Sequence, residues 1–319
     1  MRISCLPLLG CLIAACGGNF SNDDLEFLNA LPLREDLASK LPGNGVSSST
    51  SRLRQRLDAR AVGDTSQLYL DTRKASDDFN GGLDALLTLL EELRKLPPTT
   101  REPDLRVWGP WPAGDHPGHE VRFLMGREPE RFTYALQYRP VRSGEEAWWS
   151  AVTGSFKPEG GLRKGEGTVQ LLLKETRARG FDVGGFAGMD RLDIGYQTRA
   201  LPILVRMHFV PSPVQKGPDI LYQYREIPGG LGEMGFLIAD TDVLPGNAKE
   251  DLAITSRWTR DQGGMAVVAV TGGDVPPGFN AVQVECWDAG FRVTYLKRSW
   301  ETGVVGRASA CPDVSALEQ

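Results

Sequence analysis

Histidine is scarce in this chain, and the short motifs that mark many enzymes are missing. The three histidines among 319 residues are His116, His119 and His208. There is no G-x-S-x-G elbow, no H-E-x-x-H pair and no glycine-rich phosphate loop ending in Lys and Ser or Thr. These absences remove the usual signs of nucleophilic, metal-assisted or nucleotide chemistry. We therefore expect no cofactor and no bound metal, and we favour a non-enzymatic protein.

Positive charge is not in excess either. The chain has 36 Lys and Arg against 41 Asp and Glu, a formal net charge of −5 at pH 7. A nucleic-acid surface needs concentrated positive charge, so nucleic acid is not an expected partner. No apolar run reaches the roughly 20 residues that a membrane-spanning helix requires. The length is sufficient for one large β domain or two smaller units.

A short apolar leader opens the chain. Arg2 precedes the apolar residues 3–12, and after them come Ile13, Ala14, Ala15 and Cys16. This order resembles the lipobox that ends the signal peptide of bacterial lipoproteins. The resemblance implies that residues 1–15 are removed and that Cys16 carries acyl chains, palmitate among them, that hold the protein on a membrane. Gly17 and Gly18 stand where lipoproteins kept in the inner membrane have Asp, which implies the outer membrane, on its periplasmic or its cell-surface face.

The same resemblance accounts for the five cysteines. Cys5 and Cys11 would leave with the leader, and Cys16 would carry the lipid. Cys286 and Cys311 would then remain in an oxidising compartment, where two thiols pair. We expect a disulfide that ties the C-terminal tail to the strand bearing Cys286.

The first part of the mature chain is predicted to be helical. Residues 16–62 are expected to form a lipid-anchored tether with two short amphipathic pieces and a flexible serine tract. Residues 63–98 predict a helix that begins after Asp64 or Thr65 and stops before Pro97. Gly81 and Gly82 leave open a pair of helices meeting there. The apolar face of this segment has a spacing of three and four residues and consists of Leu83, Leu86, Leu87, Leu90 and Leu93.

From residue 99 to 319 the apolar period changes to two. Phe132, Tyr134, Leu136 and Tyr138 alternate with smaller or polar residues, and similar runs recur roughly every ten to fifteen residues. This spacing is typical of an antiparallel meander. The predicted fold class is α+β, mostly β, with N-terminal helices packed on a large curved antiparallel sheet that forms a half-barrel or open barrel.

A glycine-rich stretch matches a nucleotide-binding pattern in spacing only. Gly230, Gly232 and Gly235 spell G-x-G-x-x-G. A dinucleotide site needs a helix directly after this loop, whereas residues 236–239 have the pattern of a strand. We interpret the stretch as a glycine-rich hairpin or a bulged edge.

Three further groups have a chemical and a plain interpretation. His116 and His119 with Asp115 or Glu120 have the residue types of a zinc site, but the intervening Pro and Gly predict a solvated turn. An acidic stretch offers calcium ligands without the spacing of an EF-hand loop, and we expect a solvated turn. Adjacent strand residues face opposite ways, so tryptophans 148 and 149 cannot line one groove. The acidic stretch is Asp240, Asp242, Asn247, Glu250 and Asp251, and the tryptophans of this region are Trp108, Trp111, Trp148 and Trp149.

The expected function is that of a membrane-anchored envelope lipoprotein that binds an apolar ligand or another envelope protein. The order of helix and then sheet resembles the half-barrel lipoprotein carriers of the outer membrane, in architecture alone. One alternative is a carbohydrate hydrolase with paired carboxylates such as Glu166 or Asp193. The other is a structural surface lipoprotein. The expected partners are the membrane, lipid and envelope proteins.

Overall fold

The computed structural model describes residues 20–43 and 61–317, except for 115, 199–202, 215–218, 242–243, 245–247 and 261–262. The expected signal peptide and Cys16 lie outside the described residues.

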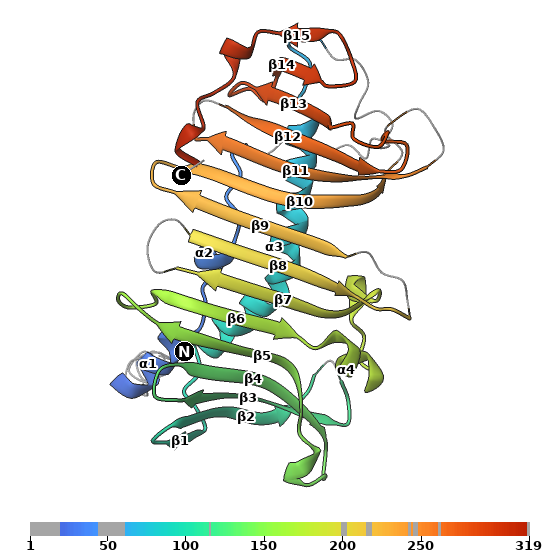
Figure 1. Ribbon diagram of the computed structural model, residues 1–319. Coiled ribbons are helices and arrows are strands. Elements are labelled where there is room, and N and C mark those ends of the chain that lie inside the picture. Colours follow the sequence, from blue (N-terminus) through green and yellow to red (C-terminus); the bar gives the residue numbers. More distant parts are fainter. Residues whose placement is uncertain are drawn as a thin grey trace, which may run out of the picture.

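One antiparallel sheet forms the body of the protein. Its 15 strands follow one another in sequence order, each paired with the next along the chain. Figure 1 shows them stacked like rungs from β1 to β15, and these two end strands are not paired with each other. The predicted α+β class with a dominant antiparallel meander is confirmed, and the sheet stays open. The strands are β1 (Thr100–Glu102), β2 (Leu105–Pro112), β3 (His119–Arg127), β4 (Phe132–Pro140), β5 (Trp149–Pro158), β6 (Gly165–Leu171), β7 (Met189–Gln197), β8 (Ile203–Pro211), β9 (Ile220–Ile227), β10 (Leu231–Thr241), β11 (Glu250–Thr259), β12 (Gly263–Gly272), β13 (Ala281–Trp287), β14 (Val293–Arg298) and β15 (Val304–Gly306).

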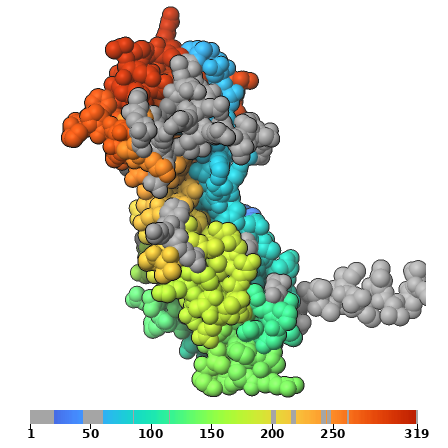
Figure 2. Space-filling model, turned by 90° about the vertical axis from the view of Figure 1, so that its right-hand side faces the viewer, coloured from blue at the N-terminus to red at the C-terminus, as the bar shows by residue number. Residues whose placement is uncertain are grey.

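A single long helix, α3 (Gln67–Leu93), runs along one face of this stack. Its 27 residues span roughly 40 Å at 1.5 Å per residue. The helix begins beside β13, where Ser66 donates a hydrogen bond to Glu285, and it ends beside β2, where the indole of Trp108 donates to the carbonyl of Leu96. It is continuous through Gly81, so the alternative of two helices does not apply. Figure 2 shows the resulting narrow, elongated body with α3 along one side of the strands.

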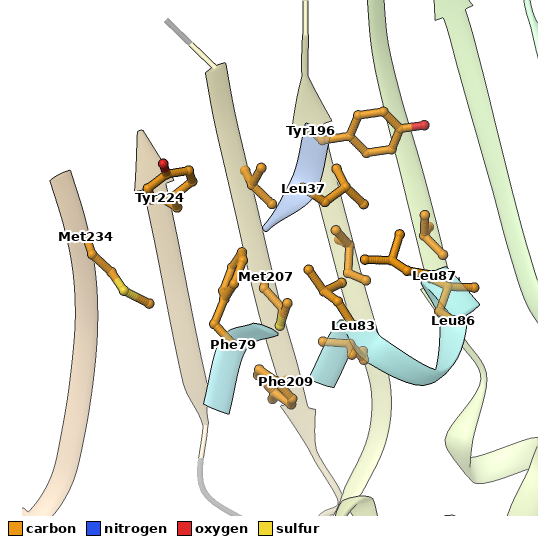
Figure 3. Close-up of a cluster of buried hydrophobic side chains, with 14 of the residues drawn as sticks. Leu37, Phe79, Leu83, Leu86, Leu87, Tyr196, Met207, Phe209, Tyr224 and Met234 are labelled. Atoms are coloured by element: carbon orange, nitrogen blue, oxygen red, sulfur yellow. The ribbon is translucent and has the colours of Figure 1, made fainter. Parts of the chain in front are cut away.

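The leucine stripe predicted from the sequence is the face of α3 that packs on the sheet. Its five leucines are all buried. Figure 3 shows Phe79 and Leu83 beside Met207 and Phe209 of β8, with Leu86 and Leu87 farther along the helix. The strands contribute inward residues at every second position, which closes one continuous core between α3 and the sheet. Burial of apolar surface on this scale is the main force that holds the helix on the sheet.

Two short helices before α3 belong to the same core. In α1 (Asn22–Asn29) Phe27 is fully buried, and in α2 (Arg34–Leu37) Leu37 is fully buried. The helical part of the predicted tether thus packs on the sheet. An ion-pair cluster fixes α1 to the first strands, because the buried carboxylate of Asp24 accepts hydrogen bonds from Arg106 at 2.6 Å and Arg101 at 3.0 Å.

The last residues cross the opposite face of the sheet. The Cys286–Cys311 disulfide joins them to β13, with the two Cα atoms 5.3 Å apart, as expected from the sequence. Arg225 of β9 donates a hydrogen bond to the carbonyl of Leu317. Val314 and Leu317 are both buried. The tail therefore covers one end of the face that points away from α3.

Candidate functional site

The two neighbouring histidines pack against aromatic rings. His116 and His119 both contact Phe181, with ring centroids 3.7 and 4.9 Å away. Glu120 pairs with Arg139 at 2.9 Å, and Asp115 is outside the described residues. Among the residues that the structure describes, no group of three or more His, Cys, Asp or Glu side chains is placed to hold a metal ion.

The acidic stretch around the start of β11 was predicted to be a solvated turn, but one of its residues, Glu250, is buried. Glu250 is fully buried and accepts hydrogen bonds from the backbone N–H of Asp274 at 2.9 Å and of Leu244 at 3.3 Å. Asp242 and Asn247 are outside the described residues, and nothing is described of the Asp240 side chain. Glu250 therefore fixes the backbone of the neighbouring loops at Leu244 and Asp274. Asp251, next to it, is exposed.

The tryptophans divide between the two faces of the sheet, as the alternation predicts. Trp149 is buried against Phe181, with ring centroids 5.0 Å apart. Trp148 lies under the guanidinium groups of Arg122 and Arg139, 4.1 and 4.5 Å from its ring. They do not line a common groove.

The two carboxylates of the hydrolase alternative lie on neighbouring strands but far apart. Glu166 of β6 is opposite Gln197 of β7, whereas Asp193 is opposite Gln170. The four-residue offset corresponds to roughly 13 Å along the strands. Catalytic carboxyl pairs of glycosidases are separated by roughly 5 to 9.5 Å. Asp193 is also held by Arg191 at 2.6 Å. This geometry gives the alternative no support in these two residues.

The glycine-rich stretch is a hairpin, as interpreted from the sequence. Gly229 and Gly230 have positive φ angles of 91° and 79° in the turn between β9 and β10. Gly232 has a different role. It lies opposite Trp258 in the register, and a Cβ placed on it would come within 2.5 Å of the indole ring. A side chain at position 232 would collide with Trp258.

Beside this glycine lies a cavity of about 610 Å³ between α3 and the strands β9 to β11. The segment after α2, residues 39–43, forms one wall and α3 contributes a second. Tyr224 and Trp258 form an aromatic wall, with ring centroids 6.3 Å apart and planes 17° apart. The volume is within the range of ordinary ligand sites, roughly 300 to 1,000 Å³.

The polar groups of the cavity are mostly paired with one another. Lys40 pairs with Glu226 at 2.9 Å, and Arg73 pairs with Asp77 at 3.3 Å. The hydroxyl of Tyr224 donates to Glu226 at 3.1 Å. Burial, followed by the nearby negative charge of Glu226, raises the pKa of Tyr224, so this hydroxyl stays protonated and remains a donor. No single residue pattern in the sequence predicts the cavity, because its walls come from three distant segments.

The face of the sheet opposite α3 carries an apolar surface on β10 to β13. Over β10 to β13, the residues that point away from the core are apolar or small in two adjacent rows. The register places the members of each row side by side across the four strands. We call these residues the outer apolar rows. They are Leu237, Ala253, Ala269 and Val282 in the first row, and Gly235, Thr255, Val267 and Val284 in the second.

Other parts of the same face are polar. Over β3 to β9 the outward positions carry pairs such as Arg122 with Gln137 at 3.0 Å and Arg206 with Gln223 at 3.2 Å. Along a strand with one solvated face, apolar and polar residues alternate, whereas a strand buried on both faces is apolar throughout. Residues 265–270 of β12, Met-Ala-Val-Val-Ala-Val, have the second pattern. This unbroken apolar run is the sequence signal that could have identified a strand with two apolar faces.

Comparison with known proteins finds no matching family model, no matching curated protein and no matching solved structure. In the described ranges, no helix combines the length and the apolar character needed to span a membrane.

Proposed function

We propose that this protein is a non-enzymatic lipoprotein of the bacterial outer membrane that docks another envelope protein on the outer apolar rows of β10 to β13. The observation that carries the proposal is the open apolar surface on a sheet whose other outward positions are largely polar. Exposed contiguous apolar patches mark interaction sites in soluble proteins. On the opposite face, the protein's own core fills most of the space under α3, and the cavity that remains is lined by charged pairs such as Lys40–Glu226, which favours a partner protein over an apolar ligand held inside the sheet.

The chain's own tail supports the choice of a protein partner. Val314 and Leu317 are buried where the tail crosses this same face, and the tail is fixed there by a disulfide. A short segment of chain that ends in the 3-10 helix Ser315–Leu317 thus already places apolar side chains on the neighbouring part of the surface. The open rows offer the same chemistry to a second polypeptide. The two rows extend roughly 14 Å across four strands, enough for the apolar centre of an interface with a polar rim.

Membrane attachment through Cys16 is the second part of the proposal. It rests on the lipobox resemblance, and the disulfide supports an oxidising compartment. Replacement Cys16→Ala is expected to leave the fold intact and to move the protein from the membrane fraction to the soluble fraction. Labelling with radioactive palmitate is expected to mark the wild type only. An unlabelled wild-type protein would contradict lipid attachment.

Docking is tested by a photo-crosslinking amino acid at Val267, at the centre of the rows, in living cells. We expect a crosslink to one protein of discrete mass. Ala253→Glu, which adds a charge at an exposed position of the rows, is expected to remove it, because docking would bury that charge. Thr133→Glu, on the outward side of β4, is the matched control and is expected to leave the crosslink unchanged.

The other outcomes contradict the docking proposal in distinct ways. A crosslink between two copies of the chain would show self-association. A crosslink to lipid would favour direct contact with the membrane. A signal equally strong in Ala253→Glu, or none in the wild type, would show that the rows are not a docking surface.

A further inference from the structure

The wall of the cavity between α3 and β9 to β11 carries an indole N–H donor that the described residues leave unused. Trp258 is 2% exposed, so its side chain is almost wholly enclosed. Its indole Nε1 has no hydrogen-bond acceptor within the described part of the chain, yet this atom is not fully sealed from the surroundings.

Gly232 packs against the edge of the indole that carries this donor. A Cβ on Gly232 would lie 2.7 Å from Nε1 of Trp258, so the indole packs directly on this glycine and fills the space that a side chain would need. Both residues line the cavity. The indole edge and Gly232, the second glycine of the G-x-G-x-x-G stretch, thus form one part of the cavity wall.

The charges of the cavity leave one cation unmatched. Lys40 is used by Glu226 and Arg73 by Asp77. Arg73 also donates to the carbonyl of Gly43 at 2.6 Å. Arg260, directly after β11, lines the cavity and has no ion-pair partner among the described residues. A guanidinium group presents several N–H donors in a planar fork that suits carboxylate and phosphate oxygens.

We propose that this cavity binds a small organic anion, whose carboxylate or phosphate oxygens are held by Arg260 and the indole N–H of Trp258. The body of the ligand lies against the aromatic wall of Tyr224 and Trp258. The charged pairs Lys40–Glu226 and Arg73–Asp77 form the rim. This site lies on the α3 side of the sheet, so it is separate from the outer apolar rows and does not depend on the proposed docking.

The test is isothermal titration of the purified mature protein with inorganic phosphate, citrate and glycerol 3-phosphate, with glycerol as the neutral control. We expect saturable binding of at least one anion and none of glycerol. Arg260→Gln is expected to weaken that binding at least tenfold. Trp258→Phe keeps an aromatic side chain but removes the N–H donor, and it is expected to weaken binding severalfold. Arg206→Gln, on the outer face of β8, is the matched control and is expected to bind like the wild type.

A second arm separates a soluble anion from a lipid headgroup. Vesicles of phosphatidylglycerol and phosphatidylcholine are offered to the protein with and without glycerol 3-phosphate. Arg260-dependent vesicle binding that the soluble anion displaces identifies a headgroup ligand, and binding of the soluble anions alone identifies a free metabolite; both outcomes support the site. Absence of saturable binding to all the anions and to the vesicles, or equal binding by wild type and Arg260→Gln, would overturn it. Circular dichroism of each variant checks that the fold is retained.

Discussion

Ser66 donates a hydrogen bond from its Oγ to Oε1 of Glu285 at 2.5 Å, across 219 residues of chain. The same carboxylate oxygen accepts the backbone N–H of Leu68 at 3.3 Å. Ser66 is the N-cap of α3, and its Oγ accepts the N–H of Tyr69 at 3.0 Å. A buried carboxylate of β13 thus sits at the positive end of the helix that closes the core.

Replacement Glu285→Gln is expected to lower the free energy of unfolding by about 1 to 2 kcal/mol, because it removes the negative charge from the helix N-terminus but keeps an acceptor oxygen. Urea unfolding followed by circular dichroism measures the change. Glu130→Gln, in the exposed turn between β3 and β4, is the control, and it is expected to stay within roughly 0.5 kcal/mol of the wild type. Equal stability of the two variants would show that the charge at the helix end is unimportant.

Asp24 makes stability depend on pH in the acidic range. Burial alone would raise its pKa, but hydrogen bonds from the backbone of Ser21 and from the side chains of Arg106 and Arg101 lower the pKa from 3.8 to about 2. A carboxyl group whose pKa is lower in the folded state stabilises the fold above the unfolded pKa, and this contribution is lost as the pH falls through the folded pKa. The shift corresponds to roughly 2 kcal/mol.

Asp24→Asn is therefore expected to be less stable than the wild type by about 2 to 4 kcal/mol at pH 7, since the charge of Arg106 is left buried without its partner. The difference is expected to shrink between pH 4 and pH 2. Unfolding curves of both proteins across this range measure it, and the comparison cancels the other carboxyl groups. A difference that stayed constant down to pH 2 would contradict the role of the Asp24 charge.

The helix and the meander could be predicted because their periodicity is local. Leu83 and Leu87 show the helical period, and Phe132 to Tyr138 show the strand period, before any contact is known. The predicted start of α3, after Asp64 or Thr65, is too early. Thr65 forms a β-bridge with Arg292, and the carbonyl of Asp64 accepts the N–H of Val293, so pairing with the region before β14 keeps these residues extended and moves the N-cap to Ser66.

The cavity between α3 and β9 to β11, which we propose to bind an anion, could not be predicted in the same way. Its donors are defined by what they lack, since Trp258 has no acceptor and Arg260 has no carboxylate partner among the described residues. Those absences depend on the positions of residues 39–43, of α3 and of β9 to β11 relative to one another. Only the glycine stretch with Gly232 pointed to this part of the fold. Its spacing is that of a nucleotide-binding loop, but such a loop needs a helix after it, and here a strand follows.

Gly81 is a site where stability can be increased. It lies within α3, and nothing in the described residues comes within 4 Å of a Cβ built there. Gly81→Ala is expected to stabilise the protein by about 1 kcal/mol, because alanine loses less backbone entropy in a helix. Gly154→Ala is the contrast, since its Cβ would come within 2.3 Å of the Tyr134 ring, and it is expected to destabilise the protein. Thermal unfolding measures both, and an unchanged or lower melting temperature in Gly81→Ala would contradict the argument.

Loss of the Cys286–Cys311 disulfide is expected to destabilise the protein and to release the tail. The bond closes a loop with a sequence separation of 25, for which the chain-entropy model gives about 3 kcal/mol. Cys311→Ser is expected to show this loss in urea unfolding and to become sensitive to proteolysis after residue 306, because only the apolar contacts of Val314 and Leu317 and the hydrogen bond from Arg225 then hold the tail. Wild type with reductant is expected to match Cys311→Ser, whereas the variant is expected to be insensitive to reductant. If reduced wild type and oxidised wild type unfold at the same urea concentration and are cut equally slowly, apolar contacts rather than the disulfide keep the tail on the sheet.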